Sequence, residues 1–431
     1  MDPAIITLCV LAVAAFLFVT ELIPLAVTAM AACTVLGILG VLPSKQVYAG
    51  LSNSTVVLFG GMFVIGAAMF KTGLAEAIGI AVVKKAGTNE LPLMAAIMIV
   101  TCVLSSVSSN TGTVACLMPV IIGICQAAKI PASKELMPLA IAANVGGTIT
   151  MIGTPPNVIV TGALSAAGLP TFGFFEFAFI GVPLSIIIVL YTLFVGRRFL
   201  PDHSAGEMDE EAVKAAKEEA GASDDNAPKS KTKMWISGLI LIGVVLCMAL
   251  DLKTVPLHTA AVTGAILCVV TGCLKEKEAY AGIDWVTIFL FAGMLSVASA
   301  MEKTGAGKLI ADSVVSMMGT NPNPYVLTAV LFLISNVLTQ FMSNTASAAL
   351  LAPIGISIAQ SIGADPKPVL MALGIAASCA FATPMATPPN TLVLGPGGFS
   401  FNDYAKVGVP MCVISLIVCL VVIPIVWPFG M

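Results

Sequence analysis

Apolar segments of membrane-spanning length follow one another along the chain, and this pattern limits what the chain can fold into. A helix needs about 20 apolar residues to cross the hydrocarbon core of a bilayer. Only 10% of the residues are charged, whereas soluble domains average about 25%. The sequence therefore predicts an all-α polytopic protein of the inner (plasma) membrane. The expected spans are residues 3–20, 24–42, 53–70, 136–168 and 174–196 in the first half and 235–251, 256–274, 285–301, 368–396 and 407–428 in the second.

Two further apolar stretches, 91–128 and 326–364, contain no Asp, Glu, Lys, Arg or His. Each is interrupted near its centre by a Ser-Asn-Thr triplet, at 109–111 and at 343–345. A turn at the lipid headgroups would collect a charge or a Pro-Gly pair, and neither is present. We expect each stretch to be a re-entrant hairpin that turns near mid-membrane, where irregular backbone is tolerated only if it is buried in protein or lines a wet cavity.

The chain repeats itself. Tyr-Ala-Gly at 48–50 recurs at 280–282, an offset of 232 residues, and the two Ser-Asn-Thr triplets are 234 residues apart. Thr-Pro-Pro-Asn at 154–157 recurs at 387–390, an offset of 233. The order and near-constant offset predict two copies of one unit, each with five spans, one re-entrant hairpin and one Pro-broken helix. Because five is odd, the second copy must insert upside down, as in many secondary transporters. The copies are assigned to residues 1–196 and 234–431.

A charged segment, 197–233, separates the two copies, with seven Lys and Arg and nine Asp and Glu. It is predicted to be a solvated linker, partly helical around 207–219. Placing it in the cytoplasm puts 15 of the 20 basic residues inside, which agrees with the positive-inside rule. Both termini are then expected outside, and the first apolar segment, which lacks a basic flank, is expected to be a span.

The Thr-Pro-Pro-Asn motifs should break the spans that carry them, because proline removes a backbone donor and clashes with the preceding turn. A broken span exposes carbonyls that suit a cation and amides that suit an anion. Ser105 and Ser109 are four residues apart and are predicted to share one helical face, as are their counterparts Thr339 and Ser343. Each pair, together with the Asn of its triplet, is predicted to gather uncharged oxygens around one sodium ion.

The paired triplets and paired Thr-Pro-Pro-Asn breaks resemble those of the divalent anion/sodium symporter (DASS) family of the ion transporter superfamily, over nearly the whole chain. The resemblance implies a homodimer in which each protomer has a scaffold and a transport domain that moves as an elevator. Several family members carry an additional N-terminal span before the repeat, whereas here we expect the repeat to begin with the first span. The resemblance implies a first sodium site at Ser105, Ser109, Asn110 and Gly153, a second at Thr339, Ser343, Asn344 and Ala386, and substrate contacts from Asn110, Thr111, Thr154, Asn344, Thr345 and Pro388.

The predicted function is sodium-coupled uptake of a C4-dicarboxylate such as succinate, malate or fumarate. Neither hairpin contains a basic residue, and a bare dianion in a dry site is costly, so sodium ions and helix ends must supply the positive charge. Sodium-independent dicarboxylate exchange, or transport of citrate or sulfate, remains as an alternative. Proton coupling would need a titratable group in the site. It is disfavoured because the two hairpin stretches contain no Asp, Glu, Lys, Arg or His. No enzymatic activity, organic cofactor or nucleic-acid partner is expected, since no zinc motif or His-activated Ser is present.

Overall fold

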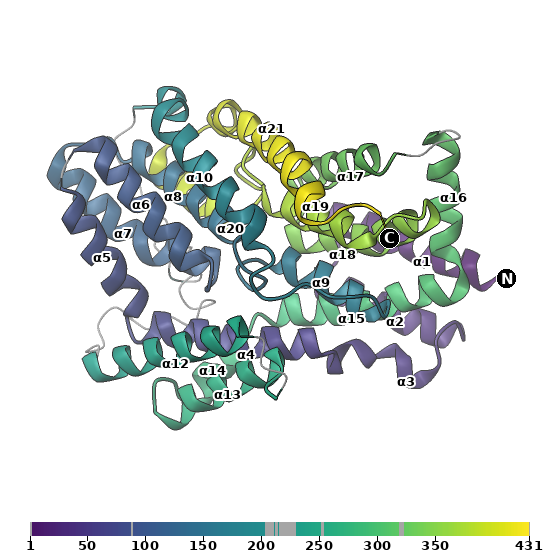
Figure 1. Ribbon diagram of the computed structural model, residues 1–431. Coiled ribbons are helices and arrows are strands. Elements are labelled where there is room, and N and C mark those ends of the chain that lie inside the picture. Colours follow the sequence, from purple (N-terminus) through teal and green to yellow (C-terminus); the bar gives the residue numbers. More distant parts are fainter. Residues whose placement is uncertain are drawn as a thin grey trace.

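The computed structural model describes residues 2–87, 89–202, 211, 214, 230–250, 254–318 and 323–430, and this part of the chain is helical (Figure 1). The helices of the first half are α1 (Pro3–Thr20), α2 (Leu25–Ile38), α3 (Ser44–Val47), η1 (Ala49–Ser52), α4 (Ser54–Lys71), α5 (Leu74–Ala86), α6 (Glu90–Ser105), α7 (Asn110–Ala128), α8 (Ser133–Gly146), α9 (Pro155–Ala166), α10 (Ala178–Phe194) and η2 (Gly196–Phe199). Those of the second half are α12 (Lys231–Ala249), α13 (Leu257–Val270), α14 (Glu276–Ala281), α15 (Trp285–Thr304), α16 (Ala306–Met318), α17 (Pro324–Thr339), α18 (Asn344–Ser361), α19 (Pro366–Ser378), α20 (Pro388–Gly397) and α21 (Phe401–Val426).

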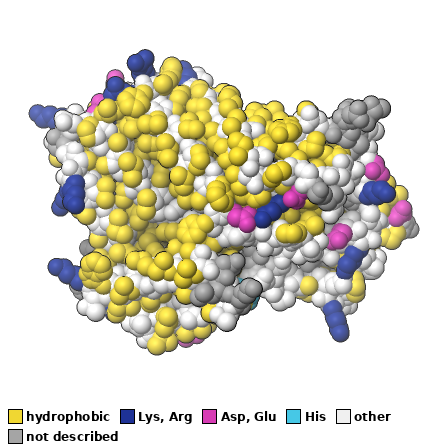
Figure 2. All heavy atoms as spheres, viewed as in Figure 1, with side chains coloured by type: hydrophobic (Ala, Val, Ile, Leu, Met, Phe, Trp, Pro, Cys, Tyr) yellow, Lys and Arg dark blue, Asp and Glu magenta, His cyan; other side chains and the backbone are white. Residues whose placement is uncertain are grey.

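The surface is that of an integral, multi-pass membrane protein. Large apolar side chains such as Phe16, Leu239 and Ile425 are exposed, and Figure 2 shows a broad hydrophobic face with many of the Lys and Arg near its two ends. Such a band is stable against lipid and unstable in water. By length and composition, six of the described helices can cross a membrane, namely α1, α4, α7, α12, α15 and α21.

The structure places a turn at each Ser-Asn-Thr triplet. Helix α6 ends at Ser105 and α7 begins at Asn110, while α17 ends at Thr339 and α18 begins at Asn344. In Figure 1 the α6–α7 hairpin lies toward one end of the molecule with α5, and the α17–α18 hairpin lies toward the other end with α16. The depth of the two tips in the bilayer and the inverted relation of the two halves stay predictions.

Both predicted Pro-broken spans are divided in two. The first consists of α8 and α9, and the second consists of α19 and α20. Helices α9 and α20 each begin at the first proline of their motif, Pro155 and Pro388. Proline is favoured there because the first residue of a helix needs no intrahelical N–H bond. The motif therefore starts the second half-helix rather than kinking a continuous one.

One prediction about side-chain geometry is wrong. Ser105 is the last residue of α6, whereas Ser109 precedes α7 and its hydroxyl accepts a hydrogen bond from the Gly112 N–H at 3.3 Å. Thr339 and Ser343 are separated in the same way. The pairs do not share a helical face, because residues 106–108 and 340–342, which lie between them, form the turns of the hairpins.

The sequence analysis also missed several helices, of which the two longest, α5 and α16, connect a span to the following hairpin in each half. They have 13 residues each and carry charged residues, so they do not match the pattern of a span. Helical structure around 207–219 in the linker was predicted for a segment that lies mostly outside the described residues.

The hairpins pack directly on the broken spans. Helix α6 packs along α8, α17 along α19, α18 along α9 and α19, and α20 along α8. The approach of α6 and α8 depends on Gly146, where a Cβ atom would lie 2.5 Å from the Cα of Cys102. This packing brings the hairpin tips to the ends of the half-helices.

Candidate functional site

A cavity of about 880 Å³ is lined by both hairpin tips and by both broken spans. Ser105 and Thr339 lie behind its wall, fully buried. The structure therefore brings residues from four separate segments of the chain to one place. The other ten residues predicted for the site all line the cavity, namely Ser109, Asn110, Thr111, Gly153, Thr154, Ser343, Asn344, Thr345, Ala386 and Pro388.

A cluster of uncharged oxygens lies at the first tip. The Ser105 hydroxyl is 2.5 Å from Asn110 Oδ1 and 2.8 Å from the Ala143 carbonyl oxygen. The same end of the Asn110 amide lies 3.1 Å from the Gly153 carbonyl oxygen and 3.3 Å from that of Ala143. If the amide nitrogen points here, it donates to all three oxygens. If the amide oxygen points here, four oxygens share one hydroxyl proton, and a cation would satisfy them.

The second tip repeats this arrangement. The Thr339 hydroxyl is 2.5 Å from Asn344 Oδ1 and 2.8 Å from the Ala377 carbonyl oxygen. Hydroxyl, amide and backbone carbonyl oxygens from a hairpin and a half-helix form the kind of set that binds Na⁺ in transporters with broken helices. With the Asn110 amide oxygen turned toward its cluster, the residues present fit sodium at both tips. Ala143 and Ala377 were not predicted, because a backbone carbonyl leaves no signal in the sequence.

The last residue of each Thr-Pro-Pro-Asn motif stabilises the break itself. The buried Asn157 side chain donates to the carbonyls of Gly147 at 3.3 Å and Thr150 at 2.9 Å. Asn390 donates in the same way to carbonyls at positions 380 and 383, at 3.0 and 2.9 Å. The amides supply donors that the broken helix has lost. The sequence contained this signal, an Asn directly after two prolines, but its role was not predicted.

The electrostatics of the cavity favour anions only through the backbone. Four helices, α7, α9, α18 and α20, begin at its wall, and each N-terminus carries roughly half a positive charge. Glu21 and Asp284 are the charged side chains among the described residues that line it, and no Lys, Arg or His is among them. An anion bound here therefore contacts helix N-termini, hydroxyls and amides. This agrees with the absence of basic residues in the hairpin stretches 91–128 and 326–364.

The arrangement of hairpins and broken helices can be compared with known families. The profile of a family described as "Citrate transporter" (CitMHS) matches residues 15–366 and 347–429, which is nearly the whole chain. The chain belongs to the citrate transporter family. The prediction of a DASS-type transporter is thereby confirmed, as is the prediction that the protein is not an enzyme.

Known transporters and one solved structure resemble the chain along most of its length. An uncharacterized transporter of Haemophilus influenzae is 30% identical and covers 95% of this chain and 89% of its own. The sodium-dependent dicarboxylate transporter SdcS of Staphylococcus saprophyticus is 26% identical, covering 94% of this chain and 83% of its own. The crystal structure of the Alcanivorax borkumensis YdaH transporter shares the fold, with a TM-score of 0.66, 14% identity and full coverage of both chains.

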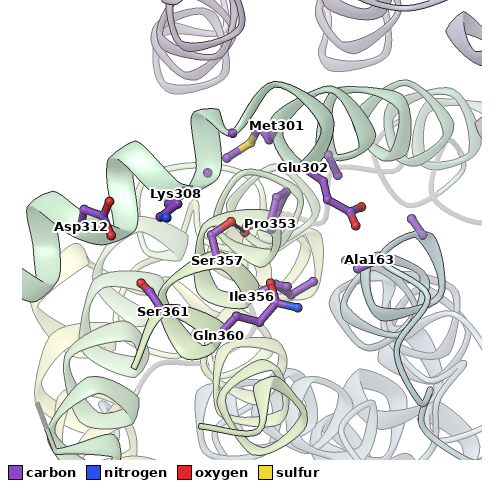
Figure 3. Close-up of a pocket in the computed structure, with 15 residues that line it drawn as sticks. Ala163, Met301, Glu302, Lys308, Asp312, Pro353, Ile356, Ser357, Gln360 and Ser361 are labelled. Atoms are coloured by element: carbon purple, nitrogen blue, oxygen red, sulfur yellow. Dashed lines mark hydrogen bonds between the residues drawn. The ribbon is translucent and has the colours of Figure 1, made fainter. Parts of the chain in front are cut away.

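A second hollow, of about 430 Å³, lies away from the tips between α15, α16 and α18 (Figure 3). Glu302, Lys308 and Asp312 line it on one side and Ser357 and Gln360 on the other. The three charged residues are exposed, and no residue predicted for the site lines this hollow. It is separate from the central cavity.

Proposed function

We propose that this member of the citrate transporter family takes up a C4-dicarboxylate, such as succinate, malate or fumarate, in symport with sodium ions. The observation that carries the proposal is the pair of uncharged oxygen clusters beside a cavity that has no basic side chain in its described lining. The name of the relative SdcS, a sodium-dependent dicarboxylate transporter, supports the same substrate and coupling ion.

In this proposal the two tips hold sodium and the residues between them hold substrate. Ser105, Ser109, Asn110 and Gly153 form the first sodium site, and Thr339, Ser343, Asn344 and Ala386 form the second. Thr111, Thr154, Thr345 and Pro388, with Asn110 and Asn344, contact the substrate carboxylates.

The coupling of sodium binding to substrate binding follows from the charge of the substrate. A dicarboxylate that leaves water for a site without Lys or Arg loses many kcal/mol of solvation. The helix N-termini offset part of this cost, and sodium held at the two tips supplies the rest of the positive charge. Substrate therefore binds well only after sodium. If more sodium charge than substrate charge is carried, uptake is electrogenic and is driven by about 2.3 kcal/mol per net charge per 100 mV.

The elevator mechanism is supported by a difference between the two hairpins. Helix α18 packs extensively on α16 and α15, whereas α7 packs much less on α5. The cavity extends to Glu21, Phe70 and Asp284, at helix ends that the positive-inside rule places in the cytoplasm. We take this conformation to be the inward-facing one of a protein that acts as a homodimer in the membrane.

Citrate is the second candidate substrate. The family profile carries its name, and a cavity of about 880 Å³ accommodates a larger anion than succinate. Hydroxyl and amide donors suit either molecule. The number of carboxylates then sets how much sodium charge must accompany the substrate.

Labelled succinate uptake into liposomes containing the purified protein tests the proposal. An inward sodium gradient should drive accumulation, and choline in place of sodium should abolish it. Equal uptake in choline would refute sodium coupling. Uptake that appears only with dicarboxylate trapped inside would instead establish exchange, and preferential competition by citrate would establish the second candidate.

A further inference from the structure

Asn144 connects the two broken spans. It lies in α8, one residue after Ala143, whose carbonyl belongs to the first oxygen cluster. Its side chain is 1% exposed. The amide nitrogen donates to Thr387 Oγ1 at 3.1 Å and to Asn390 Oδ1 at 3.0 Å, both in the second half of the chain. One side chain thus reaches from the half-helix of one cluster to the break that forms the other.

Both ends of this connection lie next to a residue proposed for a sodium site. On the first side, the Ser105 hydroxyl bonds to the Ala143 carbonyl at 2.8 Å. On the second side, Thr387 directly follows Ala386, and Asn390 holds the break through its own amide donors. The hydrogen bonds of Asn144 therefore link the residue next to the Ala143 carbonyl to the break that carries Ala386. All of these groups are buried, where each hydrogen bond is strengthened by the low dielectric.

The second half has no equivalent of this connection among the hydrogen bonds of the described residues. The offset of 234 that pairs Ala143 with Ala377 pairs Asn144 with Ser378. The Ser378 hydroxyl donates to the carbonyl of Gly374 in its own helix, at 2.9 Å. Correspondingly, Asn157 Oδ1 is buried without a hydrogen-bond partner, although its counterpart Asn390 Oδ1 accepts from Asn144. Among the described residues, Asn144 of the first half thus bonds to the break of the second half, whereas its counterpart Ser378 does not bond to the break of the first half.

We propose that Asn144 is a positioning residue that couples the two sodium sites, an inference that rests on the function proposed above. Sodium bound by the Ala143 carbonyl fixes the last turn of α8 and with it the Asn144 amide. The amide then holds Thr387 and Asn390 in the arrangement that the second site needs. Binding at either site lowers the cost of ordering the other, and thermodynamic linkage makes the effect equal in both directions.

Equilibrium binding of radiolabelled sodium to the purified protein without substrate, measured at constant temperature, tests this coupling, because the bound sodium reports the fraction of sites occupied and reaches a plateau. NaCl is titrated against choline chloride at constant ionic strength. We expect the wild type to bind sodium with a Hill coefficient near the number of sites, about 2. In Asn144→Ala the coefficient should fall to about 1, and the sodium concentration for half saturation should rise about ten-fold.

Ser378→Ala is the matched control, since it removes a buried hydroxyl at the counterpart position without touching the connection. It should keep the wild-type coefficient. If Asn144→Ala does not fold, Asn144→Ser keeps a polar group that is too short to reach Thr387, and it should give the same loss of cooperativity. A cooperative wild type with an equally cooperative Asn144→Ala overturns the coupling role alone, as does an equal loss in Ser378→Ala. A wild type that does not bind sodium overturns the proposed function itself.

Discussion

Replacing Gly146 by alanine should separate α8 from α6 and so damage the first sodium site. The added Cβ would lie 2.5 Å from the Cys102 Cα and 2.6 Å from its carbonyl oxygen, whereas ordinary contacts lie at 3.4–4 Å. The neighbours are backbone atoms, so the helices must move apart by about 1 Å, because packed interiors have no spare room. The Ser105–Ala143 hydrogen bond, 2.8 Å long, would then approach about 3.8 Å and be lost.

The expected cost follows from these two effects. Overpacking costs about 1–3 kcal/mol, and the lost hydrogen bond about 1 kcal/mol. Gly146→Ala should therefore lower the melting temperature in detergent and weaken the stabilisation by sodium. Gly123→Ala, at a position with no atom within 4 Å of the new Cβ, is the control and should be neutral or stabilising by up to about 1 kcal/mol. A Gly146→Ala protein with the wild-type melting temperature and sodium response would refute the reasoning.

Three other predictions concern the site and its support. Asn110→Ala and Asn344→Ala should each abolish sodium-driven succinate uptake while size-exclusion chromatography shows an unchanged assembly; near-normal uptake in either would mean that the site is misplaced. Asn157→Ala should cost about 2 kcal/mol of stability, because two buried carbonyls lose their donors, and an unchanged melting curve would contradict this. Glu278→Gln should cost less than about 1 kcal/mol at neutral pH. Burial raises the pKa of Glu278, but the N–H of Lys275 and the ion pair with Lys71, at 3.1 Å, lower it more, so the net shift is downward. Its stabilisation should be present above the ordinary pKa of 4.5 and lost as the pH falls through the lowered value, so wild type and variant should unfold alike once the pH is below that lowered pKa.

Much of the architecture could be predicted because hydropathy and helix-breaking are local properties. The turns at 109–111 and 343–345 were located by polar residues in otherwise apolar stretches, and the breaks were located by consecutive prolines. Helix α5 and helix α16 were missed because a short helix that carries charge looks like a loop when only the length of the apolar run is considered. The shared helical face of Ser105 and Ser109 was predicted wrongly, because spacing alone cannot show that a helix ends between two residues.

The residues of the site likewise fall into those that local sequence motifs predict and those that only packing reveals. Side chains such as Asn110 and Asn344 could be named from their repeated motifs. The carbonyls of Ala143 and Ala377 could not, since every residue has one and only packing decides which carbonyl faces a hydroxyl. The bond from Asn144 to Thr387 joins residues 243 positions apart, and no local pattern indicates it.

The amino-acid sequence by itself determined that this chain lies in a bilayer, where it turns, where its helices break and that its hairpins carry no charge, because each of these depends on the transfer free energy or backbone chemistry of neighbouring residues. Only the tertiary structure decided that both tips and both breaks line one cavity, which carbonyls complete the oxygen clusters and how the two halves are linked. These features depend on the packing of α6, α17 and α20 against half-helices distant in the chain, and such packing is set by the shapes of whole helices rather than by any short segment.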